Sequence, residues 1–211
     1  MNHDESNHPR SDRRKSRTRR QLREALFGLM LEQPYESITI EDVTRRADLG
    51  RTTFYLHYKD KEDLLLESIE AIAVELKDKI LEATKDQPSM VSKDVTAAYA
   101  PGWRPISMVL EHASENTSLY LPILRGEGTP RAPNTLRQII HDLAYEFFVN
   151  RIKTERMTVE TSIPVEVLVN FFSTSMLGML TWWLENDMPY PPEEMADMYR
   201  RLFFFGAGQV V

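Results

Sequence analysis

The spacing of apolar side chains along this chain predicts helices almost throughout. In each long segment apolar residues recur at intervals of three and four positions, which is the period of one face of a helix. These patterns predict helices over residues 13–33, 60–85, 105–116, 117–124, 135–156, 164–185 and 193–205. Prolines and glycines separate the segments, and no stretch has the alternation of a strand. The sequence therefore predicts an all-α protein.

Between the first two long helices, the sequence predicts two short helices joined by a tight turn. Thr39 is a suitable N-cap for the first, and Asp42 lies where a carboxylate favours the positive end of a helix. Asp48-Leu49-Gly50 contains residues that accept left-handed backbone, so it predicts the turn. The second short helix spans residues 51–57, with Phe54 directed into the core. Such a pair of helices, with polar and aromatic groups outside, is a device for docking in the major groove of DNA.

Positive charge is concentrated immediately before this pair of helices. The whole chain is acidic, with 26 basic and 32 acidic residues and a formal net charge of −6. Residues 10–23 nevertheless hold eight Lys or Arg residues and one acid, Asp12. A basic cluster on an acidic chain favours local contact with nucleic acid and disfavours indiscriminate coating. The other interpretation is a solvated arm, and we expect residues 1–12 to be disordered away from DNA.

The order of residues in this region resembles the tetracycline-repressor (TetR) family of bacterial transcription regulators. The residues that carry the resemblance are Thr39, Ile40, Asp42, Val43, Ala47, Leu49, Thr53, Phe54, Tyr55, His57, Tyr58, Lys61, Leu64 and Leu65. The chain departs from the family at Asp48, where Gly is usual, and at Gly50, where Ser or Asn is usual. Because Gly50 offers no side-chain acceptor to cap the second helix, the base contacts near it are left open.

The resemblance implies a DNA-binding head and a larger helical body. Residues 1–12 would be an arm, 13–60 the helix-turn-helix domain, and 61–211 the ligand-binding and dimerisation domain. The implied function is sequence-specific regulation of transcription, by default as a repressor released by a small-molecule effector. The alternative is an activator or co-regulator whose body binds a partner protein. The expected DNA-binding residues, which offer donors and flat surfaces to phosphates and bases, are Arg17, Thr39, Arg51, Thr52, Thr53, Tyr55, His57, Tyr58 and Lys61.

The last two predicted helices carry more apolar surface than one small domain can bury. Residues 167–184 are about as long and apolar as a minimal membrane span, but Asn170 and several Ser and Thr residues favour a helix buried between subunits. The resemblance implies a four-helix bundle in a homodimer, which would bind a palindromic double-stranded DNA operator. The residues expected at this interface are Phe172, Met176, Met179, Leu180, Trp183, Met195, Met198, Leu202 and Phe203.

The resemblance also implies a small apolar or amphipathic effector between the middle helices. Ten Met, three Trp and eight Tyr residues suit an adaptable cavity, although such residues at helical spacing usually form ordinary core. The candidate ligand-binding residues are Trp103, Met108, His112, Tyr120, Phe147, Met176, Met179 and Trp182. His112 is near Glu111 and Glu115 in sequence, but they form no specific metal motif, so a solvated face is the preferred interpretation and we expect no metal site.

The sequence argues against several other classes of protein. It contains no glycine-rich phosphate loop, nucleophile elbow, HExxH motif or Cys/His cluster, so we expect neither an enzyme nor a cofactor. The absence of cysteine excludes disulfides and thiolate metal sites, and suits a reducing cytoplasm. The polar N-terminus lacks the apolar segment of a signal peptide. We therefore expect a cytoplasmic protein that binds DNA and no membrane.

Overall fold

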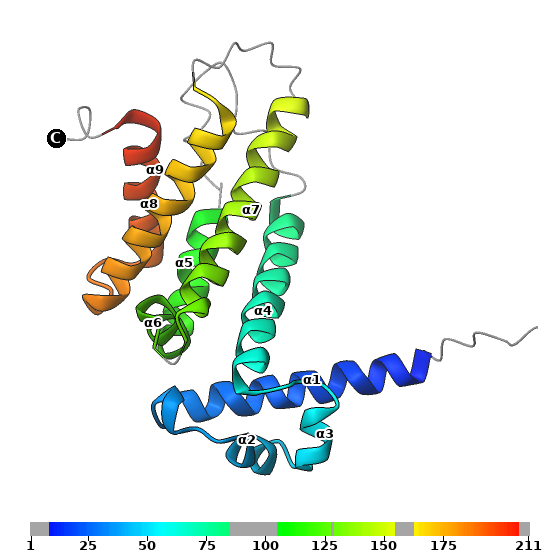
Figure 1. Ribbon diagram of the computed structural model, residues 1–211. Helices are drawn as coiled ribbons and strands as arrows, with labels where there is room; N and C mark the ends of the chain where they lie inside the picture. The colour runs from blue at the N-terminus through cyan, green and yellow to red at the C-terminus, as the bar shows by residue number, and fades with distance from the viewer. Residues whose placement is uncertain (1–8, 85–104, 128, 155–162, 207–211) are drawn as a thin grey trace, which may run out of the picture. The chain divides into compact units, whose positions relative to one another are not determined.

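The computed structural model describes residues 9–84, 105–127, 129–154 and 163–206. These residues form nine α-helices and one short 3-10 helix, and no strand occurs among them (Figure 1). In chain order the elements are α1 (Pro9–Met30), η1 (Tyr35–Ser37), α2 (Ile40–Arg46), α3 (Arg51–Tyr55), α4 (Lys61–Thr84), α5 (Pro105–Glu115), α6 (Thr117–Arg125), α7 (Arg131–Thr154), α8 (Val165–Glu185) and α9 (Pro192–Phe205). The prediction of an all-α fold is confirmed.

The first compact unit of the chain contains α1, α2, α3 and the start of α4 as far as Ser68. A short separate segment that includes Thr129 also belongs to this unit. Its core forms where α2 packs on α1 and where α3 packs on α2. The fully buried side chains that build this core include Leu22, Leu26, Val43, Phe54 and Leu64. The apolar stripe of α1 is therefore the surface on which α2 packs, and α3 packs in turn on α2. Helix α4 begins in this unit and continues into the second.

The second unit contains the rest of α4 and helices α5 to α9. Helix α7 packs along α8, α5 packs along α9, and α6 contacts α5, α7 and α8 (Figure 1). Leu110, Leu180 and Trp183 are fully buried between these helices. The indole Nε1 of Trp183 also donates a hydrogen bond to the carbonyl oxygen of Tyr190 at 2.9 Å, which fixes the turn between α8 and α9.

Tyr199 ties the last helix to α8. Its hydroxyl donates to the carbonyl oxygen of Phe172 at 2.8 Å and lies 2.9 Å from Ser175 Oγ. Burial raises the pKa of Tyr199 to about 12, so the hydroxyl remains a donor at neutral pH. The ring of Phe172 meets the Tyr199 ring edge-on, with 5.5 Å between centroids. This ring contact and the hydrogen bond hold α9 against α8.

Prolines lie at several boundaries where the observed helices differ from the expected ones. Two other differences involve no proline, since α1 ends at Met30 instead of residue 33 and α3 ends at Tyr55 instead of residue 57. Helix α1 begins at Pro9, inside the expected arm, because proline suits the first helical position, where an N–H has no partner. Helix α7 begins at Arg131, so Pro133, expected to break the helix pattern, lies in its first turn. Helix α8 follows Pro164 directly, at the start of the expected segment 164–185.

Candidate nucleic-acid interface

A capping box fixes the start of α2, the first helix of the helix-turn-helix. Thr39 Oγ1 accepts a hydrogen bond from the backbone N–H of Asp42 at 3.1 Å, and the N–H of Thr39 donates to the Asp42 carboxylate at 3.0 Å. The two bonds satisfy backbone donors that have no partner inside the helix. The hydrogen bonds from Thr39, with the Arg45 guanidinium nearby, lower the pKa of Asp42. The Asp42 carboxylate therefore stays charged and the cap stays intact at neutral pH.

The turn between α2 and α3 depends on Asp48. Its φ angle is +53°, which places Asp48 in the left-handed region, as the sequence predicted for this turn. Gly50 is different, because its φ of −81° and ψ of 151° are extended backbone that any residue can adopt. Gly50 caps α3 without a side-chain hydrogen bond, and no described atom lies within 4 Å of where its Cβ would be. The start of α3 is therefore open on this side.

Helix α3 separates a buried side from an exposed side within five residues. Phe54 is fully buried, whereas Arg51 and Thr52 are exposed and Thr53 is half-buried. Tyr55 is 52 % exposed, and its ring meets the edge of Phe54 with 5.6 Å between centroids. The exposed groups offer a guanidinium, hydroxyls and an aromatic face to a ligand outside the helix. These are the group types that contact phosphates and base edges in DNA.

Sequence reasoning missed Leu56, which follows α3 and is 78 % exposed. An apolar side chain beside exposed polar groups can contact the methyl group of thymine in the major groove. The sequence places Leu56 directly after Tyr55 and two residues after the inward-facing Phe54, and this position could have indicated that Leu56 points outward. We call the exposed residues Arg51, Thr52, Tyr55 and Leu56, together with the half-buried Thr53, the α3 face.

Basic residues of α1 act on the residue that follows the α3 face, His57. Partial burial lowers the pKa of His57, and the cations of Arg19 and Lys15 lower it further. The imidazole is therefore neutral at pH 7, with one nitrogen as donor and the other as acceptor. Arg17, also on α1, is exposed. The part of the basic cluster that includes Arg19 and Lys15 thus lies close enough to α3 to add its charge to the α3 face.

Tyr58 belongs to the core of the first unit and not to its surface. The side chain is 4 % exposed, and its ring lies 5.8 Å from that of Phe54. Burial and the carboxylate of Glu67 raise the pKa of its hydroxyl. A side chain with so little free surface cannot lie against DNA without a rearrangement of the core. We therefore leave Tyr58 out of the DNA-binding residues that we propose.

Lys61 holds the segment before α2 instead of pointing freely outward. Its ammonium donates to the carbonyl oxygens of Tyr35 at 2.6 Å and Ile38 at 2.7 Å. The same nitrogen lies 4.1 Å from the centroid of the Tyr35 ring, in a cation–π contact. Partial burial lowers the pKa of Lys61. A third, longer contact of 3.5 Å joins the same nitrogen to the carbonyl oxygen of Glu36, so the ammonium is bonded within the first unit. Sequence spacing contains no signal of this contact, because the partners are distant in the chain.

Replacing Lys61 with methionine tests this role. The carbonyl oxygens of Tyr35 and Ile38 would lose a charged donor, so we expect the first unit to lose about 1–3 kcal/mol of stability. Urea unfolding of wild type and Lys61→Met measures the loss, and Lys59→Met, at an exposed neighbour, is the matched control. Unchanged stability together with weaker DNA binding would show that Lys61 acts on phosphates instead.

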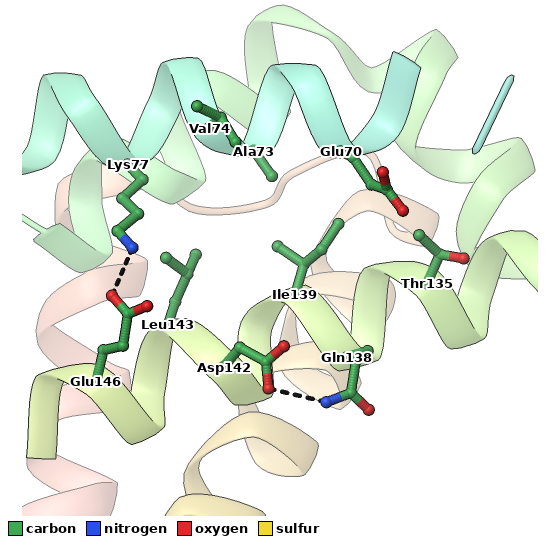
Figure 2. Close-up of a pocket in the computed structure, with 10 residues that line it drawn as sticks. All are labelled: Glu70, Ala73, Val74, Lys77, Thr135, Gln138, Ile139, Asp142, Leu143 and Glu146. Carbon is green, nitrogen blue, oxygen red and sulfur yellow. Dashed lines mark hydrogen bonds and ion pairs between the residues drawn. The ribbon is translucent and has the colours of Figure 1, made fainter. Parts of the chain in front are cut away.

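The candidate ligand-binding residues do not gather around one described cavity. His112 Nδ1 lies 2.9 Å from the Tyr120 hydroxyl, and their rings meet edge-on with 5.7 Å between centroids. Met176 is buried and Trp182 is 48 % exposed, whereas Met108 and Met179 are half-buried. Trp103 and the side chain of Phe147 lie outside the described residues. None of the eight lines the groove of about 410 Å³ that lies between α4 and α7 (Figure 2).

The pair His112 and Tyr120 is satisfied internally. Burial raises the pKa of Tyr120 to about 12, and burial together with the cation of Lys79 lowers the pKa of His112. Both groups are thus neutral at pH 7 and bonded to each other. Among the described residues, no group of three or more His, Cys, Asp or Glu side chains could hold a metal ion.

The expected dimer residues divide into a buried and an accessible group. Four of them are buried inside the second unit: Met176, Leu180, Trp183 and Met195. These side chains have little surface left for a partner, because the inner face of α8 packs against α6 and α7, and α9, which carries Met195, packs along α5. The others are half-buried or exposed: Phe172, Met179, Met198, Leu202 and Phe203. Sequence periodicity could not separate the groups, since α8 is apolar on almost every side.

Two families match the two parts of the chain. Residues 22–68 match the family described as bacterial regulatory proteins, tetR family, and residues 104–204 match a transcriptional regulator C-terminal region. The chain is 28 % identical over 188 residues to an uncharacterized HTH-type transcriptional regulator, YxbF, from Bacillus subtilis (strain 168). That match covers 88 % of this chain and 44 % of the relative, so the chain spans less than half the length of this curated relative.

Solved structures share the arrangement of helices. FadR from Bacillus subtilis, in complex with stearoyl-CoA, has a TM-score of 0.67 and 17 % identity, over 88 % of this chain and 97 % of that chain. A TetR transcriptional regulator from Streptococcus agalactiae 2603V has a TM-score of 0.59 and 25 % identity, over 92 % and 97 %. A helix-turn-helix in the part that matches the tetR family and a helical body in the part that matches a regulator C-terminal region are the arrangement of one class of proteins. The chain belongs to the TetR family.

Proposed function

We propose that this protein is a cytoplasmic homodimeric repressor that binds a palindromic operator and leaves it when a small molecule binds the helical body. The observation that carries the proposal is the α3 face, with exposed Arg51, Thr52 and Tyr55 beside the basic residues of α1. A short helix with this set of groups, held outward by a fully buried Phe54, suits the major groove. The cations of α1 supply contacts to phosphates, which position the helix without reading sequence.

An apolar stripe on the outer side of α8 supports the dimer. Val167, Phe171 and Trp182 are exposed there, and Leu202 is exposed on α9. By length and composition alone α8 could cross a membrane. In the described structure, 33 % of the most apolar 18-residue stretch of this helix is buried. Core helices of water-soluble proteins meet the same criterion. A second copy of the chain would cover the stripe, and it would place two α3 faces on one operator.

Release of DNA would follow from a shift between two conformations of the dimer. A ligand moves this equilibrium only as far as it binds one conformation more tightly than the other. In the dimer, a ligand that favours a spacing of the two α3 faces unlike that of the half-sites would weaken operator binding. Helix α4 is the continuous element through which such a change would pass, because it begins in the first unit and continues into the second.

Enrichment of genomic DNA fragments by the protein, followed by titration of the best fragment, tests the function. Tyr55→Ala should weaken binding of that fragment by about 1–3 kcal/mol, the range for one lost contact, without a change in thermal unfolding. Tyr190→Ala removes a similarly exposed phenol from the second unit and should leave affinity unchanged. Failure to enrich any fragment, or equal affinity of the two variants, would contradict the proposal.

A further inference from the structure

The groove between α4 and α7 has an apolar floor and a charged rim. It lies within the second unit and has a volume of about 410 Å³ (Figure 2). Ala73 comes to the floor from α4, and Ile139 and Leu143 come from α7 (Figure 2). Val74 of α4 also lines the groove but is 57 % exposed. The polar residues that line the groove are Glu70, Lys77, Thr135, Gln138, Asp142 and Glu146. The space is therefore suited to an apolar body with a polar group at its edge.

The rim carries excess negative charge. Glu70, Asp142 and Glu146 supply three carboxylates against the single ammonium of Lys77, which leaves two negative charges. Lys77 Nζ pairs with Glu146 Oε2 at 2.5 Å, across the groove from α4 to α7 (Figure 2). Asp142 Oδ1 accepts a hydrogen bond from Gln138 Nε2 at 2.8 Å and lies 3.4 Å from His141 Nδ1. An anionic group in this groove would meet like charge, whereas a cation would meet complementary charge.

We propose that this groove binds a lipophilic cation, in which a quaternary or delocalised positive charge is carried on an apolar body. The apolar body would lie on the floor, and the positive charge would lie against the carboxylates of the rim. A cation that cannot donate hydrogen bonds fits well, because attraction to the carboxylates needs no directed donor. This inference rests on the proposed function in one respect, since it gives the chemical class of the effector.

The Lys77–Glu146 ion pair gives the proposal a distinctive consequence. A ligand cation that lies against Glu146 competes with Lys77 for the same carboxylate. Binding therefore exchanges a contact between α4 and α7 for a contact between the ligand and α7. Because α4 begins in the first unit at Lys61, a ligand that releases α4 from α7 acts on the helix that is continuous with that unit.

Isothermal calorimetry with the full-length protein and tetraphenylphosphonium tests the site. Tetraphenylborate has nearly the same shape and the opposite charge, so it measures the contribution of charge alone. We expect the phosphonium ion to bind at least about tenfold more tightly than the borate ion, since the rim repels the anion. Absence of phosphonium binding, or equal binding of the two ions, would overturn the proposal.

Two substitutions should move the affinity in opposite directions. Glu146→Gln removes a carboxylate and should weaken phosphonium binding about fivefold, the scale of a partly exposed ion pair. Lys77→Met removes the competing ammonium and should strengthen binding by a similar factor. Asp78→Asn is the matched control, because Asp78 is an exposed acid on α4 that does not line the groove. Changes of the same sign in both groove variants would refute the competition.

The calorimetry contains no DNA, so its outcome is separate from that of the proposed function. A protein that binds its operator but not the phosphonium ion would retain the proposed function and lose the groove proposal. A protein that binds the phosphonium ion, with the expected order of variants, but enriches no DNA would retain the groove and lose the regulatory function. Circular dichroism of each variant, compared with wild type, checks that a lost affinity reflects the groove and not unfolding.

Discussion

Replacing Phe171 with glutamate should dissociate the dimer and remove operator binding. Phe171 is 56 % exposed in the single chain and lies on the outer stripe of α8 with Val167 and Trp182. A stable dimer of this type buries about 2,000 Å² or more of mainly apolar surface. An unpaired carboxylate at that surface would lose its hydration without gaining a partner. We expect the dimer dissociation constant to rise by at least about a hundredfold.

Sedimentation and DNA titration of the same samples measure this effect. Leu202→Glu, at the exposed position on α9, should behave like Phe171→Glu. Leu81→Glu introduces the same charge at an exposed position of α4 and should leave both dimerisation and DNA binding intact. The arrangement would be wrong if the wild-type protein were a monomer that binds a two-fold operator tightly.

Replacing Phe54 with alanine should destabilise the first unit by about 3–5 kcal/mol, the usual cost of deleting a fully buried phenyl ring. The loss is large because Phe54 contacts Tyr55 and Tyr58, with ring centroids 5.6 and 5.8 Å away. Without this anchor, α3 loses the contact that keeps its exposed side outward. DNA binding should fall as a consequence of local unfolding and not of a lost contact with DNA.

Hydrogen exchange of the α3 amides separates this effect from a direct one. Phe54→Ala should accelerate exchange throughout α3, whereas Tyr55→Ala should leave exchange unchanged and weaken DNA binding alone. The two variants remove neighbouring aromatic rings from the same helix, so each is a control for the other. If Tyr55→Ala unfolded α3 while Phe54→Ala did not, the assignment of inner and outer sides would be reversed.

Local chemistry accounts for what could be predicted in the helix-turn-helix. The cap of α2 needs only Thr39 and a carboxylate three residues later, and both are visible in the sequence. The left-handed turn at Asp48 and the inward position of Phe54 also depend on near neighbours in the chain. The approximate extents of the long helices followed from the same periodicity, although prolines extend some helix starts, α1 ends at Met30 and α3 ends at Tyr55, two residues before its expected end.

The features of the candidate site that the sequence did not predict arise from partners that are far apart in sequence. Tyr58 and Lys61 follow the helix-turn-helix closely, but the structure buries the first and bonds the second to the carbonyl oxygens of Tyr35 and Ile38. The groove is a similar case. Its floor combines Ala73 with Ile139 and Leu143, which no spacing rule relates.

The sequence by itself determined the all-α class, the helix-turn-helix with its cap and turn, and the concentration of basic residues near it. These features depend on interactions over three or four residues or on composition, so they can be read along the chain. Tertiary structure alone decided which side of α8 is core and which is free, because an almost uniformly apolar helix has no preferred face until its neighbours pack. It also decided that Lys61 bonds within the first unit and that α4 and α7 enclose an acidic groove, since both depend on distant segments meeting.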